Sequence, residues 1–400
     1  MRTVREAIGD ILERIAPLGS IEQVRLESAA GRVLARDVRS DVDMPPFEKS
    51  AVDGFAVRSA DFAAGPRALK QVGESKAGTP FVGRIAPGEC VAIYTGAEVP
   101  PDCDAVVMVE KSAIAGTTVT LDDQPQRGQH VCHRGEDVRV DEIVLAAGKR
   151  LTPIDLSVLS AVGCEPVPVT RRPRVALITT GDELVAPHVK PGPGQIREGN
   201  TFYLAARARA AGAEVLNLGV LPDDEVVLEQ KFREVLAACD VVMTTGGVSM
   251  GKYDLVGAVF ERCAVEPVFH KVAIKPGKPL WFGMHGKVSV FGLPGNPVSC
   301  LIGFEVFVRP ALAKLEGASA HEWTERLRIG RWRGGATKEN PRQQNLPVRI
   351  EPAADGHVDL VPLEWTSSAD IVELSRAQAL AVIEPYTIVT TGELLPYRRL

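Results

Sequence analysis

An alternation of strand-like and helix-like segments between residues 174 and 315 constrains the fold of this chain more than any other feature. Amphipathic spacing predicts helices at 200–211, 223–238 and 297–315. Short apolar runs predict strands, which are VALIT at 175–179, EVLNLGV at 214–220, DVVMTT at 240–245 and VSVFGL at 288–293. Because strands that alternate with helices form a parallel sheet covered on both faces, this region predicts a doubly wound α/β domain.

The rest of the chain has a different character. Residues 41–150 are rich in Gly, Pro and Val, and their short alternating runs predict an all-β unit with many turns. The stretch 1–35 has a helical pattern, and 150–165 has another, with Pro153 in its first turn and Gly163 as its stop. After residue 320 short alternating runs return and predict a small β unit. The predicted fold class is therefore multi-domain α/β plus β.

Composition excludes several classes of function. The 400 residues carry 46 Lys and Arg against 51 Asp and Glu, whereas proteins that bind duplex nucleic acid usually have a basic excess. Seven cysteines occur without a CxxC spacing, so we expect reduced thiols and a cytoplasmic location. No run approaches the ~20 apolar residues that a membrane-spanning helix needs. The N-terminal stretch has the spacing of an amphipathic helix rather than that of a signal peptide.

The carboxyl ends of the predicted strands concentrate glycine, hydroxyl and acidic residues, and a doubly wound sheet binds ligands at that edge. The run TTGGVSMG can bring backbone N–H groups close to an anion, because glycine carries no side chain. It is neither a P-loop nor a GxGxxG fingerprint, and a turn that only reverses the chain is the alternative. The candidate residues at these ends are Thr180, Gly181, Glu183, Asp223, Gly246, Gly247, Ser249, Asp254, Pro294, Gly295, Asn296 and Pro297.

Three acidic residues at these strand ends are candidate metal ligands. Carboxylates beside a phosphate site usually hold Mg²⁺, which bridges the like charges. Glu183, Asp223 and Asp254 therefore predict a magnesium site. Helix capping is the alternative for both aspartates, most of all for Asp223, which opens the predicted helix at 223–238. For Glu183 the alternative is a favourable interaction with a helix dipole.

Two lysines and a polar turn are further candidates. Lys275 and Lys278 lie in the loop AIKPGKP, which Pro276 and Pro279 stiffen, so the two ammonium groups suit a compact oxyanion. The alternative is a solvated basic turn. Asp53 lies in an Asp-Gly turn at 53–54, a pattern that is most often a simple hairpin. The HxCH run at 130–133 has no second Cys/His pair nearby, which disfavours a metal site there.

Several motifs in one order resemble a known family, the molybdopterin molybdenumtransferases, which include the bacterial MoeA proteins and the E domain of gephyrin. The matching segments, over roughly residues 1–315, are MPPFEKSAVDGFAV, IYTGAEVPPDCDAVVMVE, HRGEDV, TTGDELV, TTGGVSMGKYD, AIKPGKP and FGLPGNPVS. The resemblance implies four domains: an elongated helical domain from 1–40 plus 141–172, an inserted β domain at 41–140, an α/β domain at 173–318 and a C-terminal β domain at 319–400.

The resemblance also implies a reaction and a set of partners. The reaction is insertion of molybdate into adenylylated molybdopterin, with Mg²⁺, release of AMP and formation of molybdenum cofactor. The family is a homodimer in which the inserted domain of one subunit faces the α/β domain of the other. A molybdopterin adenylyltransferase and apo-molybdoenzymes are the partners it suggests, with no nucleic acid and no membrane. A pterin-binding scaffold or anchor and an adenylyltransferase that uses the same α/β domain are the alternative functions.

Residue roles follow from the same resemblance. Asp53 would be an essential acid contributed by the partner subunit, with Thr95 near the same cleft. Glu183, Asp223 and Asp254 would handle metal and pyrophosphate, while Gly246, Gly247 and Ser249 would hold the nucleotide–pterin anion. Lys275, Lys278, Pro279 and Ser299 would surround molybdate, with Arg342 and Ser368 from the C-terminal domain. The C-terminal motifs depart from the family pattern, because its second Arg is absent after Arg342 and its Gly-Ser-Gly reads Ser-Ser-Ala at 367–369.

Overall fold

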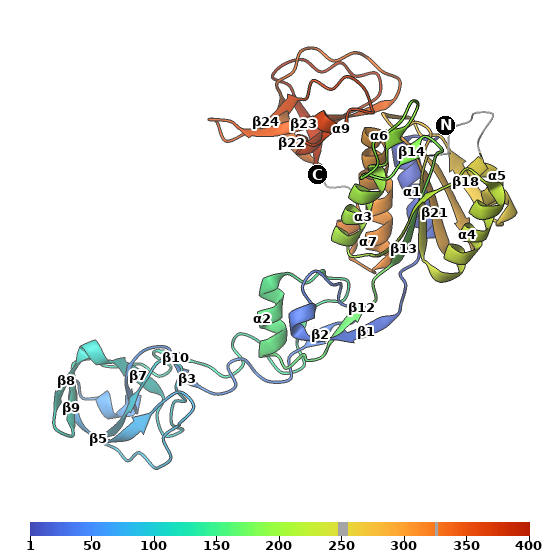
Figure 1. Ribbon diagram of the computed structural model, residues 1–400. Coiled ribbons are helices and arrows are strands. Elements are labelled where there is room, and N and C mark those ends of the chain that lie inside the picture. The colour runs from blue at the N-terminus through green and yellow to red at the C-terminus, as the bar shows by residue number, and fades with distance from the viewer. Residues whose placement is uncertain (247–254, 325–326) are drawn as a thin grey trace. The chain divides into compact units, whose positions relative to one another are not determined.

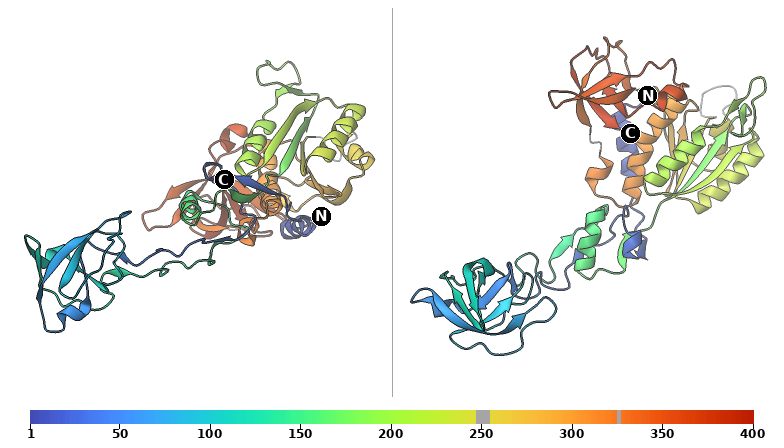
Figure 2. Two further views of the ribbon diagram at one scale, coloured as in Figure 1. Left: turned by 90° about the horizontal axis from the view of Figure 1, so that it is seen from below. Right: turned by 60° about the vertical axis from the view of Figure 1, so that its left-hand side comes forward.

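The computed structural model describes residues 1–246, 255–324 and 327–400. The chain divides into two compact units, which are described separately. The first comprises Met1–Arg36, Ala147–Thr152 and Pro168–Leu400, and the second comprises Asp37–Ala146 and Pro153–Val167. Figures 1 and 2 show the ribbons of both. The second unit is thus an insertion whose chain leaves the first unit and returns to it.

A six-stranded sheet forms the centre of the first unit. Its first four strands are parallel neighbours, the fifth pairs antiparallel with the fourth, and the sixth pairs antiparallel with the fifth. In pairing order the strands are β16 (Glu214–Leu221), β13 (Arg174–Thr180), β17 (Val241–Thr245), β21 (Val288–Leu293), β20 (Trp281–His285) and β18 (Glu266–His270). The four strands predicted from the sequence are confirmed within a residue or two.

Helices cover both faces of this sheet (Figure 1). Val175 and Leu177 of β13 pack in one core with α1 (Val4–Arg14) and α3 (Asn200–Ala210), while Ala176 and Ile178 pack in another with α4 (Glu225–Ala238) and α5 (Leu255–Arg262). Alternate residues of a strand point to opposite faces, so a strand that is apolar throughout must be covered twice. The first core also contains the continuous helical run α6 (Pro297–Gly303), a π-helical turn (Phe304–Val308) and α7 (Arg309–Leu315).

A small β domain follows at the C-terminal end. Its strands are β22 (Arg328–Trp332), β23 (Gln343–Pro352), β24 (Val358–Pro362), β25 (Ala379–Ile383) and β26 (Leu394–Arg399), and β19 (Ile274–Lys275) adds to β23. β23 pairs with both β24 and β25, so the pairing closes on itself around a core that includes Trp332, Leu360 and Tyr397. The short helix α8 (Ala320–Trp323) precedes β22 in the chain, and α9 (Ile371–Leu374) lies in the chain between β24 and β25.

The second unit is mostly β structure, as its sequence predicts. A six-stranded sheet has the order β7-β4-β6-β5-β9-β8, and its core includes Phe55, Leu69 and Val107. These strands are β4 (Gly54–Val57), β5 (Arg67–Ser75), β6 (Glu89–Ile93), β7 (Ala105–Met108), β8 (Ser112–Ala115) and β9 (Thr118–Leu121). Outside the sheet are the pairs β2 (Val38–Arg39) with β11 (Ile143–Leu145) and β3 (Lys49–Ser50) with β10 (Val131–Cys132), and the helix α2 (Pro153–Ala161).

One expectation needs correction. The predicted helix over 1–35 ends at Arg14, because Pro17 and Gly19 interrupt it, and β1 (Ile21–Val24) follows and pairs with β12 (Val167–Thr170). The apolar face of α1 packs into the core of the α/β sheet. The helix α5 and the antiparallel strands β18 and β20 were not predicted. No helix in the described ranges has the length and apolarity that crossing a lipid bilayer demands.

Candidate active site

One cavity of the first unit brings together loops from the carboxyl ends of three parallel strands. Its volume is about 570 Å³. Glu183 follows β13, Gly246 follows β17, and the loop from Pro294 follows β21. The lining residues are Glu183, Gly246, Lys275, Pro276, Gly277, Lys278, Pro279, Pro294, Gly295, Asn296, Ser299, Arg342 and Ser368. All but Pro276 and Gly277 were sequence candidates, so most of the predicted set lies in one cavity.

Two glycines form a close-packed wall of this cavity. Gly246 has φ +86°, and a Cβ there would lie 2.5 Å from the carbonyl oxygen of Thr180. A Cβ on Gly295 would lie 3.7 Å from the Cα of Gly246, so the loops after β17 and β21 meet backbone to backbone. Any side chain at position 246 would push these loops apart. The glycines therefore bring main-chain groups, rather than side chains, to the cavity surface.

The lysine loop is held by the C-terminal β domain. Lys275 ends β19, which pairs in parallel with β23 so that Lys275 lies opposite Gln344. The guanidinium of Arg342 donates to the carbonyl oxygen of Ile274 at 3.3 Å. Gly277, at φ +112°, lets the loop pass close to the carbonyl oxygen of Ser299. Lys275 is therefore fixed by strand pairing, which argues against the alternative of a loose solvated turn.

A second contact ties the C-terminal domain to the start of α6. Asn296 Nδ2 donates to Ser368 Oγ at 2.7 Å, and the N–H of Val298 donates to the carbonyl oxygen of Ser368 at 3.0 Å. Ser368 and Arg342 therefore line the cavity, even though the motifs around them depart from the family pattern.

Acidic residues lie beside this cavity at the ends of β13 and β16. The N–H of Asp223 donates to Asp182 Oδ1 at 3.4 Å. Partial burial raises the pKa of Asp223, although its side chain is largely open to solvent, and the charges of Asp182 and Glu183 raise that pKa further. A Cβ on Gly181 would lie 2.5 Å from Glu183 Oε2, so glycine at this position leaves room for the Glu183 carboxylate.

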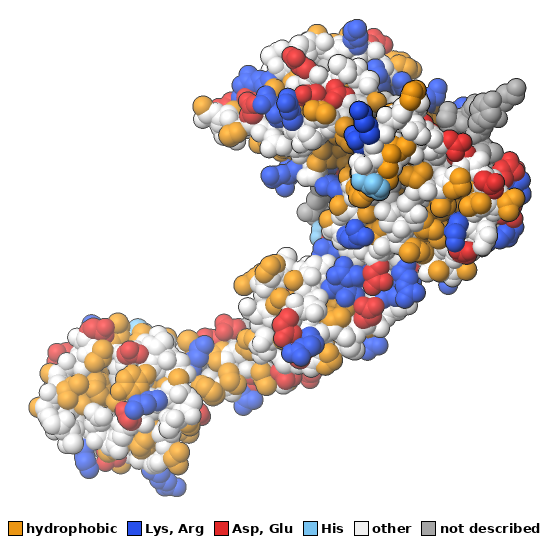
Figure 3. Space-filling model, in the orientation of Figure 1, with side chains coloured by type: hydrophobic (Ala, Val, Ile, Leu, Met, Phe, Trp, Pro, Cys, Tyr) orange, Lys and Arg blue, Asp and Glu red, His pale blue; other side chains and the backbone are white. Residues whose placement is uncertain are grey.

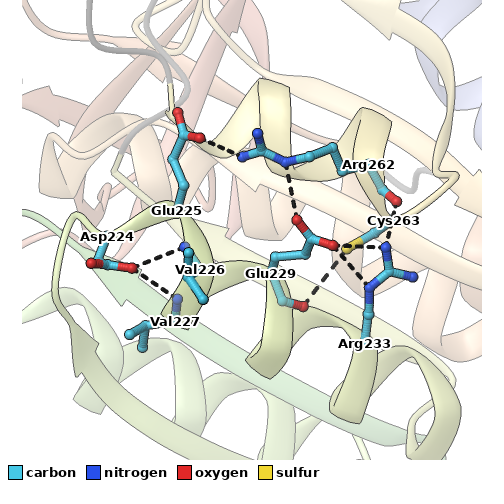
Figure 4. Close-up of polar contacts among 8 residues, drawn as sticks. All are labelled: Asp224, Glu225, Val226, Val227, Glu229, Arg233, Arg262 and Cys263. Atoms are coloured by element: carbon cyan, nitrogen blue, oxygen red, sulfur yellow. Dashed lines mark hydrogen bonds and ion pairs between the residues drawn. The ribbon is translucent and has the colours of Figure 1, made fainter.

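The residue that caps the N-terminus of α4 is Asp224, the neighbour of Asp223. Asp224 Oδ1 accepts hydrogen bonds from the N–H groups of Val226 at 2.9 Å and Val227 at 3.0 Å (Figure 4). The alternative that Asp223 is simply the helix cap is therefore wrong. Among the described residues, no group of three His, Cys, Asp or Glu side chains is arranged to hold a metal ion. Asp254, the third predicted ligand, lies outside the described residues.

Buried polar atoms under the cavity indicate a residue that was not among the candidates. Asn200 Nδ2 donates to Gly295 O at 2.6 Å and to Thr245 Oγ1 at 3.1 Å. It thereby connects the ends of β17 and β21. Within the described ranges, Asn200 Oδ1, Thr180 Oγ1 and Thr244 Oγ1 are buried without a hydrogen-bond partner. The position of Asn200 at the start of a predicted helix was the one sequence signal that could have pointed to it.

In the second unit, Asp53 and Thr95 are adjacent. Asp53 Oδ1 accepts hydrogen bonds from the N–H and from the hydroxyl of Thr95, both at 2.7 Å. The backbone bond, followed by the hydroxyl bond, lowers the pKa of Asp53. The carboxylate is therefore ionised at neutral pH.

Comparisons with known proteins agree with the motifs. A family model described as the MoeA N-terminal region, domains I and II, matches residues 2–163, and a probable molybdopterin binding domain matches residues 176–314. The molybdopterin molybdenumtransferase of Haemophilus influenzae is 38% identical over 318 residues, which are 79% of this chain and 78% of that protein. The chain belongs to the molybdopterin molybdenumtransferase family.

Further members of the molybdopterin molybdenumtransferase family extend the match to the whole chain. The Nostoc protein of that name is 36% identical over 405 residues, with 98% of this chain and 92% of that protein covered. The crystal structure of the molybdopterin biosynthesis MoeA protein from Pyrococcus horikoshii superposes with a TM-score of 0.86 at 29% identity and covers all of both chains. The predicted family and the multi-domain α/β plus β fold class are confirmed.

Not every residue expected from the molybdopterin molybdenumtransferase motifs lines the cavity. Thr180, Gly181 and Asp223 lie next to it, and the carbonyl oxygen of Pro297 accepts from the hydroxyl of Tyr203 at 3.1 Å. Asp53 and Thr95 belong to the second unit. Gly247 and Ser249 lie outside the described residues. The chemical roles of all these residues, and the four predicted domain boundaries, stay predictions.

Proposed function

We propose that this enzyme transfers molybdenum from molybdate to adenylylated molybdopterin, with release of AMP and formation of molybdenum cofactor. Membership of the molybdopterin molybdenumtransferase family supports an enzyme of molybdenum cofactor biosynthesis. The observation that carries the finer assignment is the single cavity that contains Lys275, Lys278, Ser299 and Arg342. A scaffold or anchor has no need for such a cluster of cations.

The cavity suits a compact dianion. One exposed lysine contact is worth only ~0.2–1 kcal/mol, which is too little to concentrate a trace anion. Charge-assisted hydrogen bonds from two positioned ammonium groups contribute about 1.5–3 kcal/mol each. Lys275 and Lys278 neutralise molybdate, and Ser299 together with the Gly246–Gly295 wall supplies neutral donors. The wall also lets the pterin substrate approach the backbone closely.

Mg²⁺ fits the acidic side of the cavity in charge and in donor type. Carboxylate oxygens are the ligands it prefers, and it commonly binds through one or two carboxylates plus substrate phosphates. Partial burial and then the negative charges of Asp182 and Glu183 raise the pKa of Asp223, and a bound cation would relieve the repulsion among these carboxylates. Glu183 and Asp223, with Asp254, would hold the ion. When bound, Mg²⁺ supplies charge neutralisation at the phosphoanhydride.

The complete site is shared between two subunits of a cytoplasmic homodimer, with Asp53 and Thr95 supplied by the partner subunit. Support comes from the ionised state of Asp53, since an exposed carboxylate held by two hydrogen bonds is prepared for chemistry rather than for packing. A molybdopterin adenylyltransferase supplies the substrate, and apo-molybdoenzymes receive the product.

The test is AMP release from adenylylated molybdopterin with and without molybdate. AMP release that requires both molybdate and Mg²⁺ supports the proposed reaction. An adenylyltransferase would consume ATP and molybdopterin without molybdate, and a scaffold would bind the pterin without releasing AMP. Either of those results would contradict the proposal.

A further inference from the structure

A second and larger cavity of the first unit has a wall rich in arginine. Its volume is about 870 Å³. None of its lining residues belongs to the cavity that contains Lys275 and Lys278. The lining residues are Arg207, Glu305, Arg309, His321, Glu322, Thr324, Leu327, Arg328, Arg398 and Arg399. Figure 3 shows Lys and Arg side chains gathered on the C-terminal β domain, which supplies three of these arginines.

Two of the arginines are fixed by one buried carboxylate. Glu305 is 1% exposed and lies in the π-helical turn between α6 and α7. Its Oε1 accepts from Arg207 Nε at 2.7 Å and also from Arg207 Nη2, and its Oε2 accepts from Arg309 Nε at 3.1 Å. One carboxylate therefore faces two guanidinium groups, and positive charge is left over. π-Helical turns are rare and are frequent at functional sites.

A third guanidinium, that of Arg398, is buried beside this pair, with 5% of the residue exposed. Burial lowers the pKa of Arg398 to about 10, and the positive charge of Arg309 also lowers it. The group is nevertheless charged at neutral pH. The negative charge of Glu305 raises the pKa of Arg398 in the opposite direction. Arg207, Arg309 and Arg398 thus place three guanidinium groups in one wall beside the carboxylate of Glu305.

The rim of the cavity adds exposed positive charge. Arg328 and Arg399 lie on the neighbouring strands β22 and β26, and neither forms an ion pair with any residue that the structure describes. The other acidic residue of the wall, Glu322, is engaged by Arg150, whose Nε donates to it at 2.7 Å. Among the lining residues that the structure describes, the arginines thus outnumber the carboxylates, and both carboxylates already have arginine partners.

We propose that this arginine cavity is a second anion site, distinct from the proposed molybdate cavity, that binds a ligand carrying a pyrophosphate group. Guanidinium groups bind phosphate oxygens through paired hydrogen bonds. Several guanidiniums spread over one wall match two linked phosphates, which present acceptor oxygens on adjoining centres. The cavity is large enough for an organic group attached to the pyrophosphate.

The test is isothermal titration calorimetry of the full-length chain with inorganic pyrophosphate at fixed ionic strength. Because the lysine cavity is expected to bind anions as well, every protein carries Lys275→Ala and Lys278→Ala. We expect this background to bind pyrophosphate, and adding Arg328→Gln with Arg399→Gln should raise the Kd at least about tenfold. Both side chains are exposed, so the fold should persist, which thermal unfolding checks.

The matched control adds Arg349→Gln with Arg376→Gln, which changes the net charge equally at exposed arginines outside the cavity. The Kd of this control for pyrophosphate should stay within about twofold of that of the Lys275→Ala, Lys278→Ala protein. The control substitutions change only the overall charge and leave the cavity intact. The proposal is overturned if the background does not bind pyrophosphate, or if both arginine pairs raise the Kd equally. If citrate binds as tightly as pyrophosphate, the cavity does not select a pyrophosphate group, and the proposed class of ligand is wrong.

Discussion

Asp53 Oδ1 accepts two hydrogen bonds from a single residue, Thr95, one from the backbone N–H and one from the hydroxyl, each at 2.7 Å. The two residues come from different parts of the sequence of the second unit, 42 positions apart. Both bonds favour the charged form of the carboxyl group and hold its pKa below the usual value. The stabilisation that these bonds give to the folded state is present above the unfolded pKa of Asp53 and is lost as the pH falls through the folded pKa.

Replacing Thr95 with Val should therefore raise the pKa of Asp53. The hydroxyl bond is lost while the backbone bond and the β-branched shape remain. If ionised Asp53 is needed for turnover, the acid limb of the pH–rate profile for AMP release should move to higher pH. Thr118→Val, an exposed threonine of β9, is the control and should leave the profile unchanged. If Thr95→Val does not shift the acid limb, ionisation of Asp53 does not control the rate of AMP release.

Two adjacent aspartates should have separable effects. Asp223→Asn removes a carboxylate next to Asp182 and Glu183, so the Mg²⁺ concentration for half-maximal AMP release should rise ~10-fold or more, with little change in stability. Asp224→Ala removes the cap of α4 and should cost about 0.5–2 kcal/mol of unfolding free energy while leaving the Mg²⁺ requirement unchanged. Magnesium titrations and chemical denaturation measure the two effects. If wild type and Asp223→Asn require the same Mg²⁺ concentration, Asp223 is not a ligand of the metal.

Asn200 should act by positioning the cavity wall. Asn200→Ala leaves the carbonyl oxygen of Gly295 without its partner and should cost about 1–3 kcal/mol of stability. The kcat for AMP release should fall, because the loops after β17 and β21 lose their link. Asn217→Ala, which removes only the bond from the N–H of Gly219, is the control. Destabilisation with an unchanged kcat would make Asn200 a purely structural residue.

The sequence predicted the α/β sheet well and the N-terminal stretch poorly, for physical reasons. Buried parallel strands such as β13 must be apolar on both faces, and their ends carry the glycine and acidic residues of the site, so local pattern and function coincide there. The end of α1 at Arg14 depended on Pro17 and Gly19, which are weaker signals within an apolar periodicity. The strands β18 and β20 contain Pro267 and Gly283, residues that are rare in strands.

Parts of the candidate site were beyond sequence patterns alone. The pairing of β19 with β23 fixes Lys275 through residues some 70 positions away, and no local pattern encodes that contact. Ser368 likewise reaches Asn296 only through the tertiary fold. The loop pattern identified Lys275 as a candidate, whereas only the family resemblance identified Ser368, so the resemblance carried information that spacing could not. Asn200 was missed because its role depends on two strand ends that meet only in three dimensions.

A shared site should show complementation between subunits. Asp53 and Lys275 lie in different compact units, and we propose that one subunit supplies each to a common site. Mixing Asp53→Ala and Lys275→Ala chains should give heterodimers with one intact site of two, and hence about half of the wild-type activity per heterodimer. Differently tagged chains allow the heterodimer to be isolated before the assay. A pure heterodimer as inactive as its parents would contradict sharing.

The most direct test of the central claim is AMP release as a function of molybdate concentration for wild type, Lys278→Ala and Lys287→Ala. Lys287 is an exposed lysine in the turn between β20 and β21, so its replacement matches the change in charge. The account predicts that Lys278→Ala raises the half-maximal molybdate concentration at least about tenfold, with partial rescue at high molybdate, and that Lys287→Ala behaves as wild type. Superimposable curves for all three proteins would contradict the assignment of the lysine cavity to molybdate.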